Sequence, residues 1–444
     1  MIGKRAAENR RCFAFRCHAL ATVTLGCSIS FRCDIWPALE AKRRWESRSG
    51  RNAGCAMMVT KPVFDRLGFW LWVGAFLIVL GLALWSPDAR SVVHIYRHGS
   101  EAFLAGEPLY QVEVAMGYLY APAFAVLYVP LLKFGPYLGN VLWHMLGFGV
   151  LTFAAMRQVR KVGGEEQTWL LSFGLFLALP VSLAALRNGQ ATILLTGACW
   201  FLTLSALEGR RAECFFWAMF AIVAKPTAII MLLLAGALRP RLIPALALAV
   251  LVVLVIPYGF ASTDYINAQY HDFFRLLTSM TVDPTGPFVP ADFTAPFTRF
   301  GMPIPESVAT IVRVVAGLLT LWLVLQFDRR LDSNLSGLAI FLAAAFYMCV
   351  FNPRVEQNTY AMVAVPAGLS IALLWREKGA GAIRWFLATL LLVTGLTSVD
   401  LRLHDLFHLW FRPLSVSIIA CVLIGWLWTQ DRQKAPAAGA VAHG

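Results

Sequence analysis

The stretch that decides the fold reads RLGFWLWVGAFLIVLGLALWSPD and runs from Arg66 to Asp88. Its apolar core carries no charge and is about 20 residues long, enough for a helix to cross the hydrocarbon core of a bilayer. Because lysine and arginine gather on the cytoplasmic side of membrane proteins, Arg66 predicts that this span starts in the cytoplasm. The span therefore delivers Asp88 to the outer face.

The rest of the 444-residue chain continues this pattern, being 59% hydrophobic and only 14% charged. Average soluble domains carry roughly a quarter charged residues. The repeated apolar runs predict an all-α polytopic membrane protein with about 12 membrane helical segments. We place these segments at residues 66–85, 137–156, 168–186, 191–207, 212–224, 226–238, 242–260, 306–327, 335–351, 360–375, 382–399 and 413–428.

The net charge of +13 indicates topology rather than nucleic-acid binding. Residues 1–66 hold 13 Lys or Arg against 5 acids, and most other cations lie in short turns between apolar runs. This distribution predicts a multi-pass protein of the plasma (inner) membrane, with both termini cytoplasmic and no nucleic-acid partner. It also requires residues 121–132 to form a short surface helix of the outer leaflet rather than a span.

Three regions follow from this reading. We expect residues 1–56 to be a disordered or non-native extension, 57–430 to be the transmembrane domain, and 431–444 to be a cytoplasmic tail. The long outward segment 261–305 is rich in Pro, aromatic residues and Asp and is predicted to be a loop. The nine cysteines match no zinc spacing, so no disulfide framework and no metal site are expected.

The first outer loop, from Asp88 to Pro122, is polar in a chain with few polar stretches. Ser86-Pro87-Asp88 is typical of a helix start, and the residues from Val92 to Phe103 predict a short helix lying in the membrane interface. One interpretation makes Asp88 only the cap of that helix. The other makes it a functional carboxylate at the outer face.

The motifs of this loop resemble glycosyltransferase family 87, whose members have the GT-C fold. The resemblance covers about residues 65–375 and rests on the following motifs: Asp88 with Tyr96, Gly106-x-Pro108-x-Tyr110, Tyr118-x-Tyr120-x-Pro122, Arg187-Asn188-Gly189-Gln190 and Lys225-Pro226. Where the family commonly has two prolines after the tyrosine, this chain has Ala121-Pro122-Ala123.

The resemblance implies a membrane glycosyltransferase, of the phosphatidylinositol-mannoside mannosyltransferase type, acting at the outer face. It would move a mannose-like hexose or a pentose from a polyprenyl-phosphate donor to a lipid or glycan acceptor. Asp88 would be the catalytic base, and Tyr96, Tyr110 and Tyr120 would bind substrate. A carboxylate can accept the acceptor's hydroxyl proton, and direct displacement would invert the anomeric centre.

Cations would stabilise the leaving phosphate, so no metal or other cofactor is expected. The absence of a DxD motif from residues 88–136 fits this prediction. The cationic candidates are Arg187, beside Gln190, then Lys225 and Arg354; Glu356 could hold the acceptor.

Each of these candidates also has a structural interpretation. Arg187 could anchor a helix end, Lys225 could extend to the interface, and Arg354 could form an ion pair with Glu356 in a tight turn. Two histidine pairs, His94 with His98 and His404 with His408, have helical spacing but no third ligand, so we interpret them as interfacial residues.

Two other classes of protein remain open at this point. A secondary transporter could frame a midplane site with half-helices that meet at Lys225-Pro226. A non-catalytic subunit of an envelope assembly would not depend on Asp88.

Overall fold

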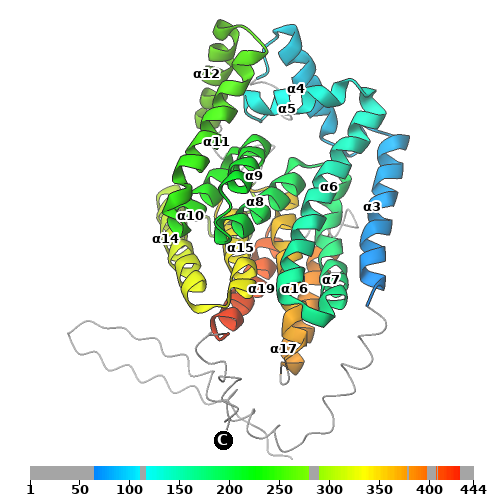
Figure 1. The fold of residues 1–444 in the computed structure, drawn as a ribbon, viewed down its shortest axis with the longest axis vertical. Helices are drawn as coiled ribbons and strands as arrows, with labels where there is room; N and C mark the ends of the chain where they lie inside the picture. The colour runs from blue at the N-terminus through cyan, green and yellow to red at the C-terminus, as the bar shows by residue number, and fades with distance from the viewer. Residues whose placement is uncertain are drawn as a thin grey trace, which may run out of the picture. The chain divides into compact units, whose positions relative to one another are not determined.

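The computed structural model describes residues 65–110, 117–279, 290–377, 380–397, 407 and 409–430, and every regular element in these ranges is a helix (Figure 1). This confirms the prediction of an all-helical protein. The predicted tails at 1–56 and 431–444 lie outside the described residues, so the division of the chain into three regions stays a prediction.

Eight of the described helical segments are long and apolar enough to cross a membrane. Their helices are α3 (Leu67–Trp85), α6 (Gly135–Val162), α7 (Gln167–Arg187), α11 (Ile243–Val255), α14 (Glu306–Arg330), α15 (Ser333–Val350), α16 (Ala361–Trp375) and α19 (Phe411–Trp428). Short 3-10 turns lengthen three of these segments: η1 (Gly164–Glu166) before α7, η3 (Pro240–Leu242) and η4 (Ile256–Gly259) around α11, and η5 (Gln357–Tyr360) before α16.

The other four predicted segments are also helices, but each is too short to meet the same length criterion. They are α8 (Ala191–Leu207), α9 (Arg211–Ala224), α10 (Ile229–Leu238) and α17 (Gly381–Leu396). Length and hydropathy therefore support eight spans, and the predicted count of about 12 is not confirmed.

Two local predictions of helix length and helix breaks are confirmed, while the outer-leaflet position of the first helix stays a prediction. Residues Pro122–Leu132 form α5, a helix of 11 residues that is too short to cross. Helix α9 ends before Lys225, whose backbone is extended at φ −156° and ψ 133°. Pro226 then opens the 3-10 turn η2 (Pro226–Ala228), because a proline ring is tolerated in the first turn of a helix but not in its interior.

The core of the protein is the contact between α7 and α16. All residues of α16 are buried, and Gly368 lies directly against Gly174 of α7. A Cβ atom at Gly368 would lie 2.3 Å from the Gly174 carbonyl oxygen. Small residues at such a crossing let two helix backbones pack closely, which is the main source of van der Waals contact between helices in lipid.

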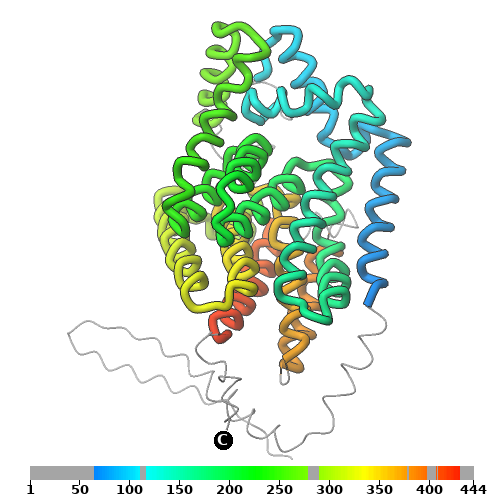
Figure 2. Tube along the Cα trace, in the orientation of Figure 1, coloured from blue at the N-terminus to red at the C-terminus, as the bar shows by residue number. Residues whose placement is uncertain are grey.

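Helices α4 (Val93–Ala105), α5 and α12 (Thr263–Ser279) lie together at one end of the described helices (Figures 1 and 2). The prediction that residues 261–305 form only a loop was wrong, because this stretch contains α12 and the short α13 (Ala295–Arg299). The backbone N–H of Leu109 donates to the buried Gln269 side chain at 2.9 Å, and the Tyr265 hydroxyl donates to the Glu107 carbonyl at 2.7 Å. Helix α12 thus holds the Gly-x-Pro-x-Tyr turn in place.

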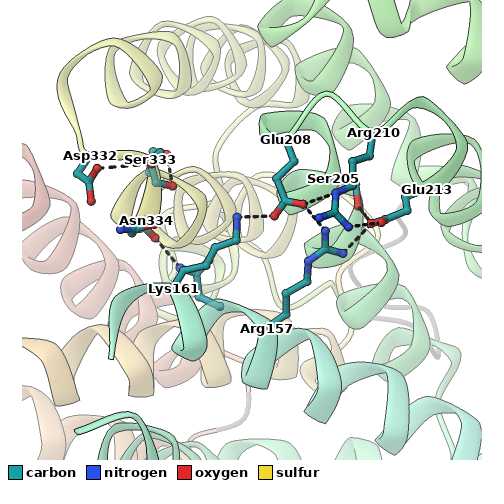
Figure 3. A network of polar contacts seen from close by, with 11 residues as sticks. Arg157, Lys161, Ser205, Glu208, Arg210, Glu213, Asp332, Ser333 and Asn334 are labelled. Carbon is teal, nitrogen blue, oxygen red and sulfur yellow. Dashed lines mark hydrogen bonds and ion pairs between the residues drawn. The ribbon is translucent and has the colours of Figure 1, made fainter. Parts of the chain in front are cut away.

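A network of ion pairs joins α6, α8 and α9 near the C-terminal end of α6 (Figure 3). Arg157 pairs with Glu208 at 2.6 Å and with Glu213 at 2.7 Å. Lys161 also pairs with Glu208, and Arg210 pairs with both acids. Because two acids share three cations, this network fixes the three helix ends relative to one another.

Candidate functional site

The loop that carries Asp88 is anchored to the first turns of α6. The Asn140 side chain donates to the Pro87 carbonyl at 2.9 Å. Helix α4 begins only at Val93, so Asp88 is not its cap, and the predicted helix start at residues 86–88 was wrong. The Asp88 side chain is 57% exposed, and its Oδ1 accepts from Arg97 at 3.2 Å. The carboxylate is therefore accessible and sits beside a cation.

This loop lies directly against the Arg187–Gln190 turn between α7 and α8. The Val92 N–H donates to the Asn188 carbonyl at 3.0 Å, and the Ser91 hydroxyl bonds the same oxygen at 3.5 Å. These bonds bring together two motifs that lie 97 residues apart in the sequence. The acid and the arginine motif therefore share one surface.

Gly189 is required for this close approach. Its φ is +61°, and a Cβ atom there would lie 2.4 Å from Val93 Cγ2 and 2.8 Å from His144 Cε1. The Gly189 carbonyl also accepts from the Trp143 indole at 2.7 Å. Glycine reaches positive φ without steric cost, so the turn can fit between α4 and α6.

The predicted tyrosines come together beside this turn. The Tyr96 and Tyr120 hydroxyls are 2.9 Å apart, and the Ala191 N–H donates to the Tyr96 hydroxyl at 3.1 Å. The Tyr110 hydroxyl donates to the Tyr120 carbonyl at 2.7 Å. A hydroxyl network of this kind holds the side chains in one orientation.

Burial keeps these tyrosines neutral. Desolvation is the largest effect on both Tyr96 and Tyr120 and raises the pKa of each well above its ordinary value. The negative charge of Glu356 acts on both phenols and raises their pKa further. Neutral phenols donate and accept hydrogen bonds but do not act as bases at neutral pH.

Glu356 joins the site through Gln190. The Gln190 Nε2 donates to Glu356 Oε2 at 2.8 Å, although the two residues are 166 positions apart. Arg354 does not pair with Glu356 in the described structure. Its backbone N–H donates to Asn352 Oδ1 at 3.0 Å, and its guanidinium donates to the Leu277 carbonyl near the end of α12. The interpretation of this turn as an ion pair between Arg354 and Glu356 is therefore wrong.

Lys225 lies at the break between α9 and α10, and no described acid forms an ion pair with it. The Lys225 backbone is extended, so α9 ends before it and the cation lies where the two short helices meet.

An apolar cavity of about 270 Å³ lies between α5, α9 and the C-terminal part of α11. Val126 and Val223 are among its lining residues, close along the chain to Tyr120 and Lys225 respectively. The cavity is also lined by Ala123, Leu127, Pro130, Met219, Phe220, Val253, Ile256 and Phe260. It can accept a hydrocarbon chain but offers few polar groups.

Within the described ranges, no three His, Cys, Asp or Glu side chains gather as metal ligands would. The ring centroids of His94 and His98 are 6.5 Å apart, and His98 bonds Glu101 at 3.1 Å. His404 and His408 lie outside the described residues.

The sequence did not indicate three parts of this site. These are Arg97 as the partner of Asp88, Asn140 as the anchor of its loop, and α12 as the support of the Gly-x-Pro-x-Tyr turn. The only available signal was the spacing of Tyr265, Ile266, Gln269 and Phe273, which lie on one helical face.

Fold and site together define a membrane-embedded helical protein with a polar site built from the turns at one end of its spans. The family profile described as glycosyltransferase family 87 matches residues 118–353, which is more than half of the chain, and the protein belongs to that family. The match contains Tyr120, Arg187, Gln190 and Lys225. The comparison with curated proteins finds no match to this chain.

Proposed function

We propose that the protein transfers a mannose-like hexose or a pentose from a polyprenyl-phosphate donor to a lipid or glycan acceptor. The reaction would take place at the outer face of the plasma membrane, with both termini in the cytoplasm. The observation that carries the proposal is the hydrogen bond from Val92 to Asn188, which joins the Asp88 loop to the Arg187–Gln190 turn. This contact places an accessible carboxylate on a segment next to cationic and hydroxyl groups, in a protein that belongs to a glycosyltransferase family.

In this mechanism Asp88 takes the proton of the acceptor hydroxyl while its oxygen attacks the anomeric carbon. The bond from that carbon to the donor phosphate breaks, and the phosphate leaves as an anion. One displacement inverts the anomeric centre. Arg97 donates to Asp88 Oδ1 at 3.2 Å and so holds the carboxylate in place. A phosphate leaving group can be stabilised by cations alone, so a metal-independent reaction is proposed.

The apolar cavity supports a lipid-linked donor. Its lining includes Ala123, three residues after Tyr120, and Val223, two residues before Lys225. A prenyl chain in the cavity would leave its phosphate near Lys225, a cation without a described acidic partner. A cation beside buried apolar surface in a membrane protein is energetically costly, and such residues commonly mark a substrate path.

The remaining site residues would bind the sugar and the acceptor. The half-buried Tyr120 would face the sugar, and the buried Tyr96 and Tyr110 would complete this subsite by holding Tyr120 in place. Gln190 would orient Glu356 toward the acceptor. Arg354 would contribute charge near the same turn, although one of its donors is occupied by the Leu277 carbonyl.

The decisive variant for the role of Asp88 is Asp88→Asn, which is isosteric and cannot accept the proton. We expect its turnover to fall by about 10²–10⁴-fold while donor binding and thermal stability stay close to wild type. Glu356→Gln is the matched carboxylate control, and it should raise the acceptor KM more than it lowers turnover. Full activity of Asp88→Asn would remove Asp88 from the mechanism.

A further inference from the structure

Arg90 has a strained backbone beside the proposed base. Its φ is +53°, and it is the only described residue other than glycine with a positive φ. Arginine gains nothing locally from this left-handed conformation, which glycine adopts freely and asparagine tolerates. Strained positions of this kind persist where the surrounding structure fixes them, and they cluster at functional sites.

Arg187 is the second unusual arginine of this surface. Its Nη1 atom is buried and has no hydrogen-bond partner in the described structure. A buried guanidinium donor without a partner loses its hydration and gains nothing in return. The described acids also form no ion pair with Arg187, so its charge is uncompensated.

The two arginines share one surface. The Val92 N–H donates to the Asn188 carbonyl at 3.0 Å, which holds the segment after Arg90 against the residue after Arg187. The nearest acid on the loop, Asp88, already pairs with Arg97 at 3.2 Å. The two arginines thus lie on adjoining backbone segments, and neither forms an ion pair with a described acid.

We infer that Arg90 and Arg187 form a clamp for a phosphate group of one of the two substrates, with Arg90 as a substrate-binding residue. Two guanidinium groups suit phosphate because each presents parallel N–H donors to its oxygens. The anion would satisfy the buried donor of Arg187 and remove the repulsion between the two cations. The phosphate can belong to the donor or to an anionic acceptor.

This inference rests on the proposed function but is tested without turnover. Two sugar-free probes are titrated against the full-length protein in detergent: undecaprenyl phosphate for the donor, and dioleoylphosphatidylglycerol for a phosphodiester acceptor. Arg90→Gln and Arg187→Gln are each expected to weaken binding of one probe at least about tenfold. The probe that responds identifies the substrate. If the wild-type protein shows no transferase activity but still binds a probe through this pair, the proposed function is contradicted and the clamp is supported.

A double variant tests whether both arginines hold the same phosphate. If they do, the two contacts act as a unit. The double variant Arg90→Gln with Arg187→Gln then loses much less affinity than the two single fold-losses multiplied together would predict. Arg160→Gln, an exposed arginine at the C-terminal end of α6, is the charge-matched control and should bind both probes as wild type does.

Arg90→Gly separates binding from folding. Glycine suits φ +53°, so this variant should unfold at the same temperature as wild type or higher, while its phosphate binding falls as in Arg90→Gln. Lower thermal stability of Arg90→Gly, or wild-type affinity in both single glutamine variants, would overturn the inference. So would a wild-type protein that binds neither probe.

Discussion

At the scale of single residues, the site depends on tyrosine hydroxyl groups. The sequence motifs predicted which tyrosines matter but not which groups their hydroxyls bond. Tyr96 was predicted to bind substrate, and the structure adds that its hydroxyl accepts the Ala191 N–H and bonds Tyr120. The pairing of Gln190 with Glu356 could not be predicted, because it joins turns 166 residues apart. The charges of the turns in a sequence indicate on which side of the membrane each turn lies. They do not indicate which other turn it contacts.

Tyr96→Phe removes a hydroxyl with two partners. The buried Ala191 N–H then loses its acceptor, and the protein should be destabilised by about 1–3 kcal/mol. Because Tyr120 also loses its partner, transferase kcat/KM should fall as well. Thermal unfolding and initial rates measure the two effects. Tyr137→Phe, whose side chain is exposed on α6, is the control and should change neither.

At the scale of helices, hydropathy predicted the long spans and the break at Lys225, because both depend on local composition. It did not predict α12. This helix lacks a long apolar run, since only one of its faces is apolar and Gln269 interrupts that face. Nearby prolines and aspartates made the whole segment look like a loop. The helical spacing of apolar residues was present in α12, but the loop-like composition of the longer stretch 261–305 outweighed it in the prediction.

The crossing of α7 and α16 makes a sharp prediction about Gly368. In Gly368→Ala the new methyl group would lie 2.3 Å from the backbone oxygen of Gly174, so the two helices must move apart. We expect a clear loss of thermal stability. Gly425→Ala is the matched control, because nothing lies within 4 Å of its Cβ position on α19 and alanine favours helices. Equal stability of the two variants would contradict the packing described.

The ion-pair network at the end of α6 predicts a dependence of stability on pH. Burial alone would raise the pKa of Glu208, but hydrogen bonds from Lys161 and Arg157 outweigh it, and the pKa is lowered. A lowered folded-state pKa gives stability that is present above the unfolded value of about 4.3 and is lost as pH falls through the folded value.

Glu208→Gln should therefore unfold at a temperature a few degrees below wild type at neutral pH, with the difference shrinking as the pH falls below about 4. Glu165→Gln, an exposed acid at the same end of the bundle, should match wild type throughout. A constant difference between Glu208→Gln and wild type across this pH range would show that the ion pairs do not stabilise the helix ends.

At the scale of the whole molecule, the account predicts opposite sides for the site and the network. Cysteine placed at Ser262, before α12, should react with a membrane-impermeant maleimide in intact cells, whereas cysteine at Glu165 should react only after permeabilisation. Both positions are exposed in the structure. The reverse pattern would invert the proposed topology. Activity measured in each variant shows whether the substitution itself disturbs the enzyme.

The most direct test of the central claim is a transfer assay with purified protein. Wild type and Asp88→Asn are incubated with a panel of polyprenyl-phosphate sugars and membrane lipid or glycan acceptors, and the products are analysed by mass spectrometry. The account predicts that wild type glycosylates an acceptor and releases polyprenyl phosphate, while Asp88→Asn binds the same donor and forms almost no product. Transfer by Asp88→Asn at the wild-type rate, or transfer only from nucleotide sugars, would contradict it.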